Sequence, residues 1–166
     1  MFLSILQDTI TDSEKQEICD YVYPRMKYKK QDGNLYKISR YSVSNDSPHV
    51  IKKTHQKIKR ETEKIINLKL HSEVSYILNY NIGARANTHT DSHIESYVTA
   101  ITFLNLSDDL EGGVSYVGRL IDGKVSRLHI PIIEKDTLLY GSKMLHGVTE
   151  ITKGSRLVFV NWYKKA

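Results

Sequence analysis

Cysteine is nearly absent from this sequence. Among its 166 residues only Cys19 carries a thiol, so an intramolecular disulfide is excluded. Long apolar runs are absent as well, and without 18 consecutive apolar residues no segment is expected to cross a membrane. The first residues, Met1 to Asp8, have neither the basic start nor the extended apolar core of a secretory leader. These absences favour a cytoplasmic protein that keeps its thiol reduced and has no membrane partner.

The composition is ordinary for a globular protein, at 40% hydrophobic and 26% charged residues. The length fits one domain over residues 1–166, with enough chain for a sizeable core. The net charge of +5 is uneven, because residues 25–69 carry 13 lysines and arginines against four acidic residues. This basic segment is either a solvated helix face or a surface for an acidic partner or nucleic acid. The solvated face is the simpler interpretation.

The N-terminal part, residues 1–73, reads as mixed structure with two helices. A short apolar strand is expected over residues 2–6. Thr11 followed by Glu14 is the pattern of a capping box, which predicts the start of a first helix. In residues 35–43 apolar and polar side chains alternate, which predicts a strand.

A second, longer helix is expected over residues 48–68. Ser47 followed by Pro48 predicts an N-cap with proline at the first helical position. Its expected apolar stripe consists of Ile51, Ile58, Ile65 and Ile66. Lysines fill the other faces, so this helix should cover a sheet and present a basic face to water.

From residue 74 onward the pattern changes to short strands separated by glycine-containing turns. The predicted strands are Val74–Tyr80, Tyr97–Asn105, Val114–Val117, Val125–Ile133, Thr137–Tyr140 and Leu157–Tyr163. Strands at this spacing indicate a sandwich or barrel. We therefore predict a mainly β fold, in which a jelly-roll core (a double-stranded β-helix, or cupin-like barrel) over residues 74–166 is covered outside by the two helices.

Four polar residues in this second half form the candidate active site: His89, Asp91, His146 and Arg156. Residues two apart on a strand or its edge point the same way, so His89 and Asp91 can reach one ion. Two imidazoles and one carboxylate make the facial triad of non-haem Fe(II) oxygenases, which leaves open positions on the metal. The guanidinium of Arg156 can grip a carboxylate through two hydrogen bonds. Together they predict an oxygenase that uses Fe(II) and a dicarboxylic keto acid.

The other histidines leave one ambiguity. His93 has the same spacing to Asp91 as His89, so it is an alternative ligand, although we favour His89 and place His93 around the site or at the surface. His129 lies in an apolar strand and is expected to be a satisfied core or face residue. The sequence pattern places His49, His55 and His71 on the surface, in or beside the basic helix.

Taken in order, these motifs resemble the Fe(II)- and 2-oxoglutarate-dependent dioxygenases, and within them the prolyl 4-hydroxylase-like branch. The resemblance covers roughly residues 74–163. The matching stretches are Tyr80-Asn81-Ile82-Gly83, His89-Thr90-Asp91, Thr99 to Asn105, Glu111-Gly112-Gly113, Asp136 to Tyr140, His146-Gly147-Val148 and Gly154-Ser155-Arg156.

The resemblance implies a role for each matching residue. His89, Asp91 and His146 correspond to the iron ligands, and Arg156 to the basic residue that binds the far carboxylate of 2-oxoglutarate. Tyr80 corresponds to a tyrosine lining the cofactor and substrate pocket. The implied cofactors are Fe(II), 2-oxoglutarate and O2, with ascorbate as the reductant.

Further matches concern the walls of the barrel. Thr99 and Phe103 correspond to inward positions of a core strand, and Trp162 to an aromatic on the last strand. Some prolyl hydroxylases carry at position 103 a tyrosine that helps bind the co-substrate. Phenylalanine cannot donate a hydrogen bond, so Tyr80 or Thr99 is expected to take that role.

The resemblance implies hydroxylation of substrate coupled to decarboxylation of 2-oxoglutarate to succinate. A prolyl residue of a protein or peptide is the favoured substrate, docked between the segments 35–43 and 112–120. A free amino acid or small metabolite is the alternative. Nucleic-acid demethylation is disfavoured because such enzymes carry a second arginine where this chain has Trp162. A non-catalytic jelly-roll binding module and a cupin-like metalloprotein with other chemistry remain further alternatives.

Overall fold

The computed structural model describes residues 2–92 and 95–166 of the chain. Its elements are β1 (Leu3–Leu6), α1 (Asp12–Val22), the 3-10 turn η1 (Tyr23–Arg25), β2 (Lys27–Asp32), β3 (Leu35–Ser42), α2 (His49–Ile66), β4 (Leu70–His89), β5 (Val98–Leu106), β6 (Ser115–Ile121), β7 (Lys124–Ile130), β8 (Thr137–Gly141), β9 (Leu145–Val148) and β10 (Arg156–Lys165). Within the described part of the chain, no helix is long and apolar enough to cross a membrane.

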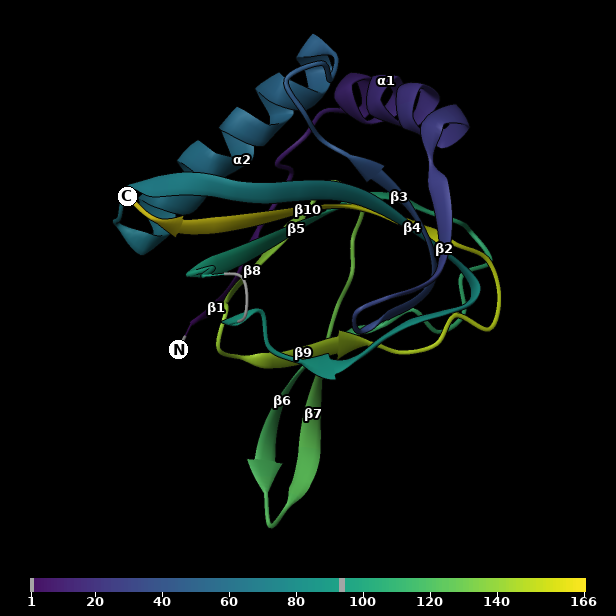
Figure 1. Cartoon of the computed structure of the whole chain (residues 1–166), viewed down its shortest axis with the longest axis vertical. Helices are drawn as coiled ribbons and strands as arrows, with labels where there is room; N and C mark the ends of the chain where they lie inside the picture. The colour runs from purple at the N-terminus through teal and green to yellow at the C-terminus, as the bar shows by residue number, and fades with distance from the viewer. Residues whose placement is uncertain (1, 93–94) are drawn as a thin grey trace.

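The strands form one curled antiparallel sheet in the order β1-β8-β5-β10-β4-β9-β6-β7, with β3 added beside β4 and β2 beside β3. Curling brings β9 and β6 opposite β5 and β10 (Figure 1). This is the predicted jelly roll with helices outside. Three strands of the N-terminal part, β1, β2 and β3, join the same sheet, and β2 is a lysine-rich strand that the sequence pattern did not indicate.

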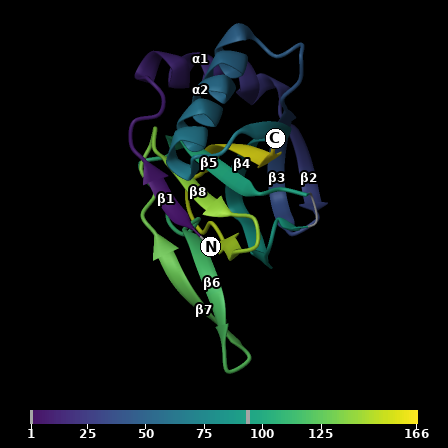
Figure 2. The ribbon, with the colours of Figure 1, turned by 90° about the vertical axis from the view of Figure 1, so that its left-hand side faces the viewer.

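Both helices pack on the outer face of the β5–β10–β4 region, while the β6–β7 hairpin projects from the other end of the molecule (Figures 1 and 2). One apolar cluster lies beneath the helices and a second lies inside the barrel. Helix α1 begins with the predicted capping box, in which Thr11 accepts a hydrogen bond from the Glu14 amide and the Glu14 carboxylate accepts one from the Thr11 amide. The sequence therefore predicted this helix start correctly.

Helix α2 differs from its prediction in two details. Pro48, not Ser47, is the N-cap. The Ser47 hydroxyl forms a hydrogen bond with the Tyr41 hydroxyl and accepts another from the Ser44 amide, so it does not cap the helix. Ile65 is 51% exposed instead of joining the apolar stripe. With about 3.6 residues per turn, Ile65 points between the directions of the buried Thr54 and Ile58, so helical phase does not explain its exposure. It lies in the last turn of α2, where Lys64 is exposed as well.

Strand β4 continues well beyond the predicted end at Tyr80. It has hydrogen-bonded neighbours along its whole course, first β10, then β3 and finally β9, and these pairings carry it past Gly83. Gly83 has a φ of 83° and donates its amide hydrogen to the Ile151 carbonyl, so the glycine produces an irregularity within a strand and not a turn. The extension brings His89 directly opposite His146 on β9.

His55 is buried, and its predicted surface position is wrong. It lies on the sheet-facing side of α2, where Nδ1 is 2.7 Å from Asn161 Oδ1 and Nε2 is 2.7 Å from Ser72 Oγ. The lysine-rich composition of α2 concealed this, because the helix buries polar groups where partners on β4 and β10 satisfy them. His49 and His71 are exposed as predicted, and His129 is exposed on β7.

The buried imidazole predicts an acid-sensitive contact between helix and sheet. Burial lowers the pKa of His55, and the positive charge of Lys59 lowers it further. The hydrogen bond with Asn161 raises the pKa but does not offset the burial. The folded pKa therefore lies below the unfolded value of about 6.5. The stabilisation by neutral His55 is complete above about pH 6.5 and is lost as the pH falls through the folded pKa.

We expect the free energy of unfolding to fall more steeply between about pH 7 and pH 5 in the wild type than in His55→Gln. Urea denaturation at a series of pH values measures both profiles. His49→Gln, at an exposed position at the start of the same helix, is the matched control and should follow the wild type. Parallel profiles for the wild type and His55→Gln would contradict the prediction.

Candidate active site

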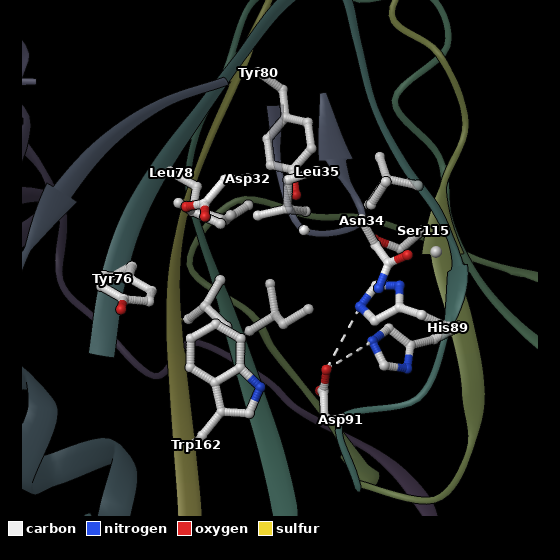
Figure 3. Close-up of a pocket in the computed structure, with 18 of the residues that line it drawn as sticks. Asp32, Asn34, Leu35, Tyr76, Leu78, Tyr80, His89, Asp91, Ser115 and Trp162 are labelled. Carbon is white, nitrogen blue, oxygen red and sulfur yellow. Dashed lines mark ion pairs between the residues drawn. The ribbon is translucent and has the colours of Figure 1, made fainter. Parts of the chain in front are cut away.

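Three of the predicted residues converge on one point inside the barrel. Nε2 of His89 and Nε2 of His146 lie 3.5 Å and 3.4 Å from the same oxygen, Oδ1 of Asp91. One potential ligand atom from each residue lies within 4.8 Å of the others, and Figure 3 shows His89 and Asp91 turned toward each other at one side of the cavity. Such a cluster can hold one metal ion through two imidazoles and a carboxylate, with the remaining positions open.

Backbone carbonyls orient both imidazoles. Nδ1 of His89 is 2.6 Å from the Asn87 carbonyl oxygen, and Nδ1 of His146 is 2.9 Å from the Met144 carbonyl oxygen. A carbonyl only accepts, so each Nδ1 must carry the proton and each Nε2 keeps its lone pair for a metal. The rings are therefore held in the ligating tautomer by the chain itself.

Asp91 lies beyond the end of β4, in a bend, so strand alternation alone does not position it. Its amide donates to the Ser142 carbonyl at 2.9 Å, and its Oδ2 accepts a 2.6 Å hydrogen bond from Thr99. Burial opposes ionisation, but contacts with His146, His89 and Thr99 together hold the pKa of the Asp91 carboxyl well below its usual range. The carboxylate is therefore ionised and ready to bind a cation.

The cluster faces a cavity of about 280 Å³ that also receives Arg156. Arg156 is 1% exposed, and Nη1 donates to the Gly113 carbonyl and to Ser115 Oγ, whereas Nε has no partner among the described residues. Its guanidinium lies against the rings of Tyr80 and Phe103, and no described acidic residue pairs with it. A buried cation without a counter-ion is costly, and a carboxylate-bearing ligand in the cavity would neutralise it.

The remaining predicted residues divide between the cavity and its supports. Tyr80 lines the cavity, and burial raises its pKa to about 12, so the phenol stays protonated and can donate a hydrogen bond. Thr99 does not line the cavity, and its only hydroxyl hydrogen is donated to Asp91. Its predicted contact with the co-substrate stays a prediction. His93 lies outside the described residues.

Some cavity residues were not singled out from the sequence. Ser115 holds Arg156, and Tyr140 packs its ring 4.4 Å from that of His146. Arg40 lies over Tyr76, which meets the wall residue Trp162 edge-on (Figure 3 shows the two aromatics). These residues lie far apart in the sequence and belong to unremarkable strand patterns. Arg40 and Ser115 lay inside the predicted docking segments and Tyr140 inside a matched motif, but no individual role was predicted for any of them.

Comparison with known proteins bears directly on this geometry. No family model matches the chain. Over 89 residues the sequence is 34% identical to a PKHD-type hydroxylase of Gloeothece citriformis (strain PCC 7424). That match covers 50% of this chain but only 39% of the hydroxylase, so the chain spans well under two thirds of this relative.

Solved structures match nearly the whole chain. The non-haem alpha ketoglutarate dependent epimerase SnoN from nogalamycin biosynthesis superposes with a TM-score of 0.77 at 15% identity, covering 99% of this chain and 78% of SnoN. A Pseudomonas putida prolyl-4-hydroxylase superposes with a TM-score of 0.70 at 14% identity, covering 99% of this chain and 92% of that one. The chain has the fold of the 2-oxoglutarate- and Fe(II)-dependent oxygenases.

Within this oxygenase fold, the residues present fit both implied groups. The two Nε2 atoms and Asp91 Oδ1 form a donor set suited to Fe(II), with each tautomer already set. The unneutralised Arg156 in the same cavity fits the far carboxylate of 2-oxoglutarate. The jelly roll brings these residues together from the end of β4, the bend that follows it, β9 and β10.

Proposed function

We propose that this protein is an Fe(II)- and 2-oxoglutarate-dependent dioxygenase, with a single catalytic domain over residues 1–166, that hydroxylates a prolyl residue of a polypeptide. The observation that carries the proposal is the pairing of a His-Asp-His cluster with a buried, unneutralised arginine in one cavity. A metal site alone would suit many proteins. The buried positive charge of the arginine favours binding of a second, anionic ligand beside the metal.

The bound Fe(II) supplies the activation of O2 that couples conversion of 2-oxoglutarate to succinate and CO2 with insertion of one oxygen atom into a C–H bond of the substrate. The chain's own residues bind and orient. His89, His146 and Asp91 hold the metal, and Arg156 grips the far carboxylate of 2-oxoglutarate with its fork of donors. The phenol of Tyr80 donates a hydrogen bond to the same co-substrate. The apolar cavity wall limits the access of water.

Several observations support a prolyl substrate. The Gloeothece citriformis relative is a PKHD-type hydroxylase. The Pseudomonas putida prolyl-4-hydroxylase shares the fold over 92% of its own chain. The cavity lining includes Leu35 and Arg40 of β3 and Ser115 and Tyr116 of β6, which agrees with docking of a peptide between segments 35–43 and 112–120. With one buried thiol, Cys19, and no described membrane-spanning helix, we place the reaction in the cytoplasm.

The test is succinate formation from 2-oxoglutarate with Fe(II), O2 and ascorbate, with and without a panel of proline-containing peptides. We expect a peptide to stimulate turnover and to gain one oxygen atom on proline, as read by mass spectrometry. Asp91→Ala is the inactive control. Leu35→Ala should raise the Michaelis constant for a stimulating peptide by about 3- to 10-fold, because it removes part of a contact worth about 1.5–3 kcal/mol when fully buried, and should leave the constant for 2-oxoglutarate unchanged.

The other outcomes separate the alternatives. Iron-dependent turnover that free amino acids or small metabolites stimulate, and peptides do not, would overturn the prolyl assignment and keep the oxygenase. A protein that neither binds metal nor forms succinate would be a jelly-roll binding module.

A further inference from the structure

Asp91 is held at its two oxygens by different partners. Oδ1 faces Nε2 of both His89 and His146, whereas Oδ2 accepts the hydroxyl hydrogen of Thr99 at 2.6 Å. Among residues 2–92 and 95–166, Thr99 is the only side chain that donates to Oδ2. The two oxygens are therefore distinguished before any metal arrives.

Thr99 is well placed to control this carboxylate. It is 0% exposed in the middle of the sheet, paired with Tyr140 on β8 and with Trp162 on β10. A β-branched side chain at such a position has little rotational freedom about χ1, so its hydroxyl is held in one direction. Asp91 itself lies beyond β4, where the strand no longer sets the direction of its side chain.

We propose that Thr99 is a positioning residue for the metal centre, which fixes the Asp91 carboxylate so that only Oδ1 points to the ion. This inference rests on the proposed function. The hydrogen bond restrains rotation about the Cβ–Cγ bond and occupies Oδ2, so that Asp91 would offer the ion one oxygen, Oδ1, and not both. Outer partners of this kind orient metal ligands, and their loss typically weakens metal binding about 10- to 100-fold.

Metal binding without turnover tests this proposal. Isothermal titration of the apoprotein with Mn(II) should give a dissociation constant about 10- to 100-fold higher for Thr99→Val than for the wild type. Thr99→Ser keeps the hydroxyl and should bind nearly as tightly as the wild type. Thr99→Ala gives the same comparison with a smaller side chain, in case valine disturbs the packing.

Thr102→Val is the matched control. Thr102 is a buried threonine of the same strand, and its hydroxyl lies 2.7 Å from that of Thr137, away from the metal cluster. It should lose stability, as any buried hydrogen-bonded threonine does, but keep the Mn(II) affinity of the wild type. Weakened binding in Thr99→Val and Thr99→Ala, with Thr99→Ser and Thr102→Val unaffected, would support the positioning role.

Two results would overturn it. Wild-type Mn(II) affinity in Thr99→Val and Thr99→Ala would show that the carboxylate needs no such support, and the proposed function would stand. A wild-type protein that binds no divalent metal at all would instead remove the proposed function, and this inference with it.

Discussion

Replacing Asp91 with alanine is expected to abolish metal binding and all metal-dependent turnover while the fold is retained. Asp91 supplies the only carboxylate of the cluster, and its Oδ1 is the atom that both imidazoles approach. Loss of an outer partner costs about 10- to 100-fold in metal affinity, so loss of a direct ligand should cost more than about 100-fold. The structural cost is moderate, because the variant leaves mainly the buried Thr99 hydroxyl without its acceptor, at about 1–3 kcal/mol.

Titration with Mn(II) and succinate formation with Fe(II) measure the two losses, and circular dichroism and thermal unfolding check the fold. Asp108→Ala is the matched control, since Asp108 is an exposed aspartate in the turn after β5. It should behave as the wild type in every measurement. Full metal affinity in a folded Asp91→Ala protein would show that the cluster is not the metal site.

Replacing Arg156 with methionine should affect ligand binding and stability in opposite directions. Removal of one partner of a buried charged contact costs about 2–5 kcal/mol, so the dissociation constant of 2-oxoglutarate for the Mn(II)-loaded protein should rise about 30-fold or more. Without ligand, however, Arg156 is a buried cation that no described acidic residue neutralises, and burial lowers its pKa. An apolar side chain of similar length removes that cost, so the ligand-free variant should be at least as stable as the wild type.

Urea denaturation of the ligand-free proteins measures the stability, and calorimetry in the presence of Mn(II) measures the affinity for 2-oxoglutarate. A ligand at about 100 times its dissociation constant stabilises the folded state by about 2.7 kcal/mol, so 2-oxoglutarate should stabilise the wild type and not Arg156→Met. Arg156→Lys keeps the charge without the planar fork and should fall between them. Equal affinity for 2-oxoglutarate in all three proteins would remove Arg156 from the co-substrate site.

Local patterns predicted most of the fold. The capping box at Thr11 and Glu14, the two helices, and the strands 98–106, 137–141 and 156–165 lie at or near their expected places. These features depend on neighbours along the chain, and a sequence displays such neighbours directly. The sequence did not predict strand β2, because an edge strand rich in lysine lacks the alternating apolar residues of a core strand.

Other features depended on partners from distant segments. The extent of β4 past Gly83 follows from pairing with β9 and β3, and burial of His55 follows from Asn161 and Ser72. Neither set of partners can be read from the local residues. Ile65 is exposed in the last turn of α2 although its helical phase matches that of the buried residues, so the periodicity alone could not predict its exposure.

For the site, the sequence by itself determined the chemistry, because residue types limit what a side chain can donate, accept or ligate. His89, Asp91, His146 and Arg156 were recognisable by type, spacing and resemblance. Only the tertiary structure decided their working state: the tautomer of each imidazole, the hydroxyl of Thr99 on Asp91, and the isolation of Arg156 from any described counter-ion. These properties arise from contacts between strands far apart in the chain, and such contacts exist only once the sheet has curled and closed its interior.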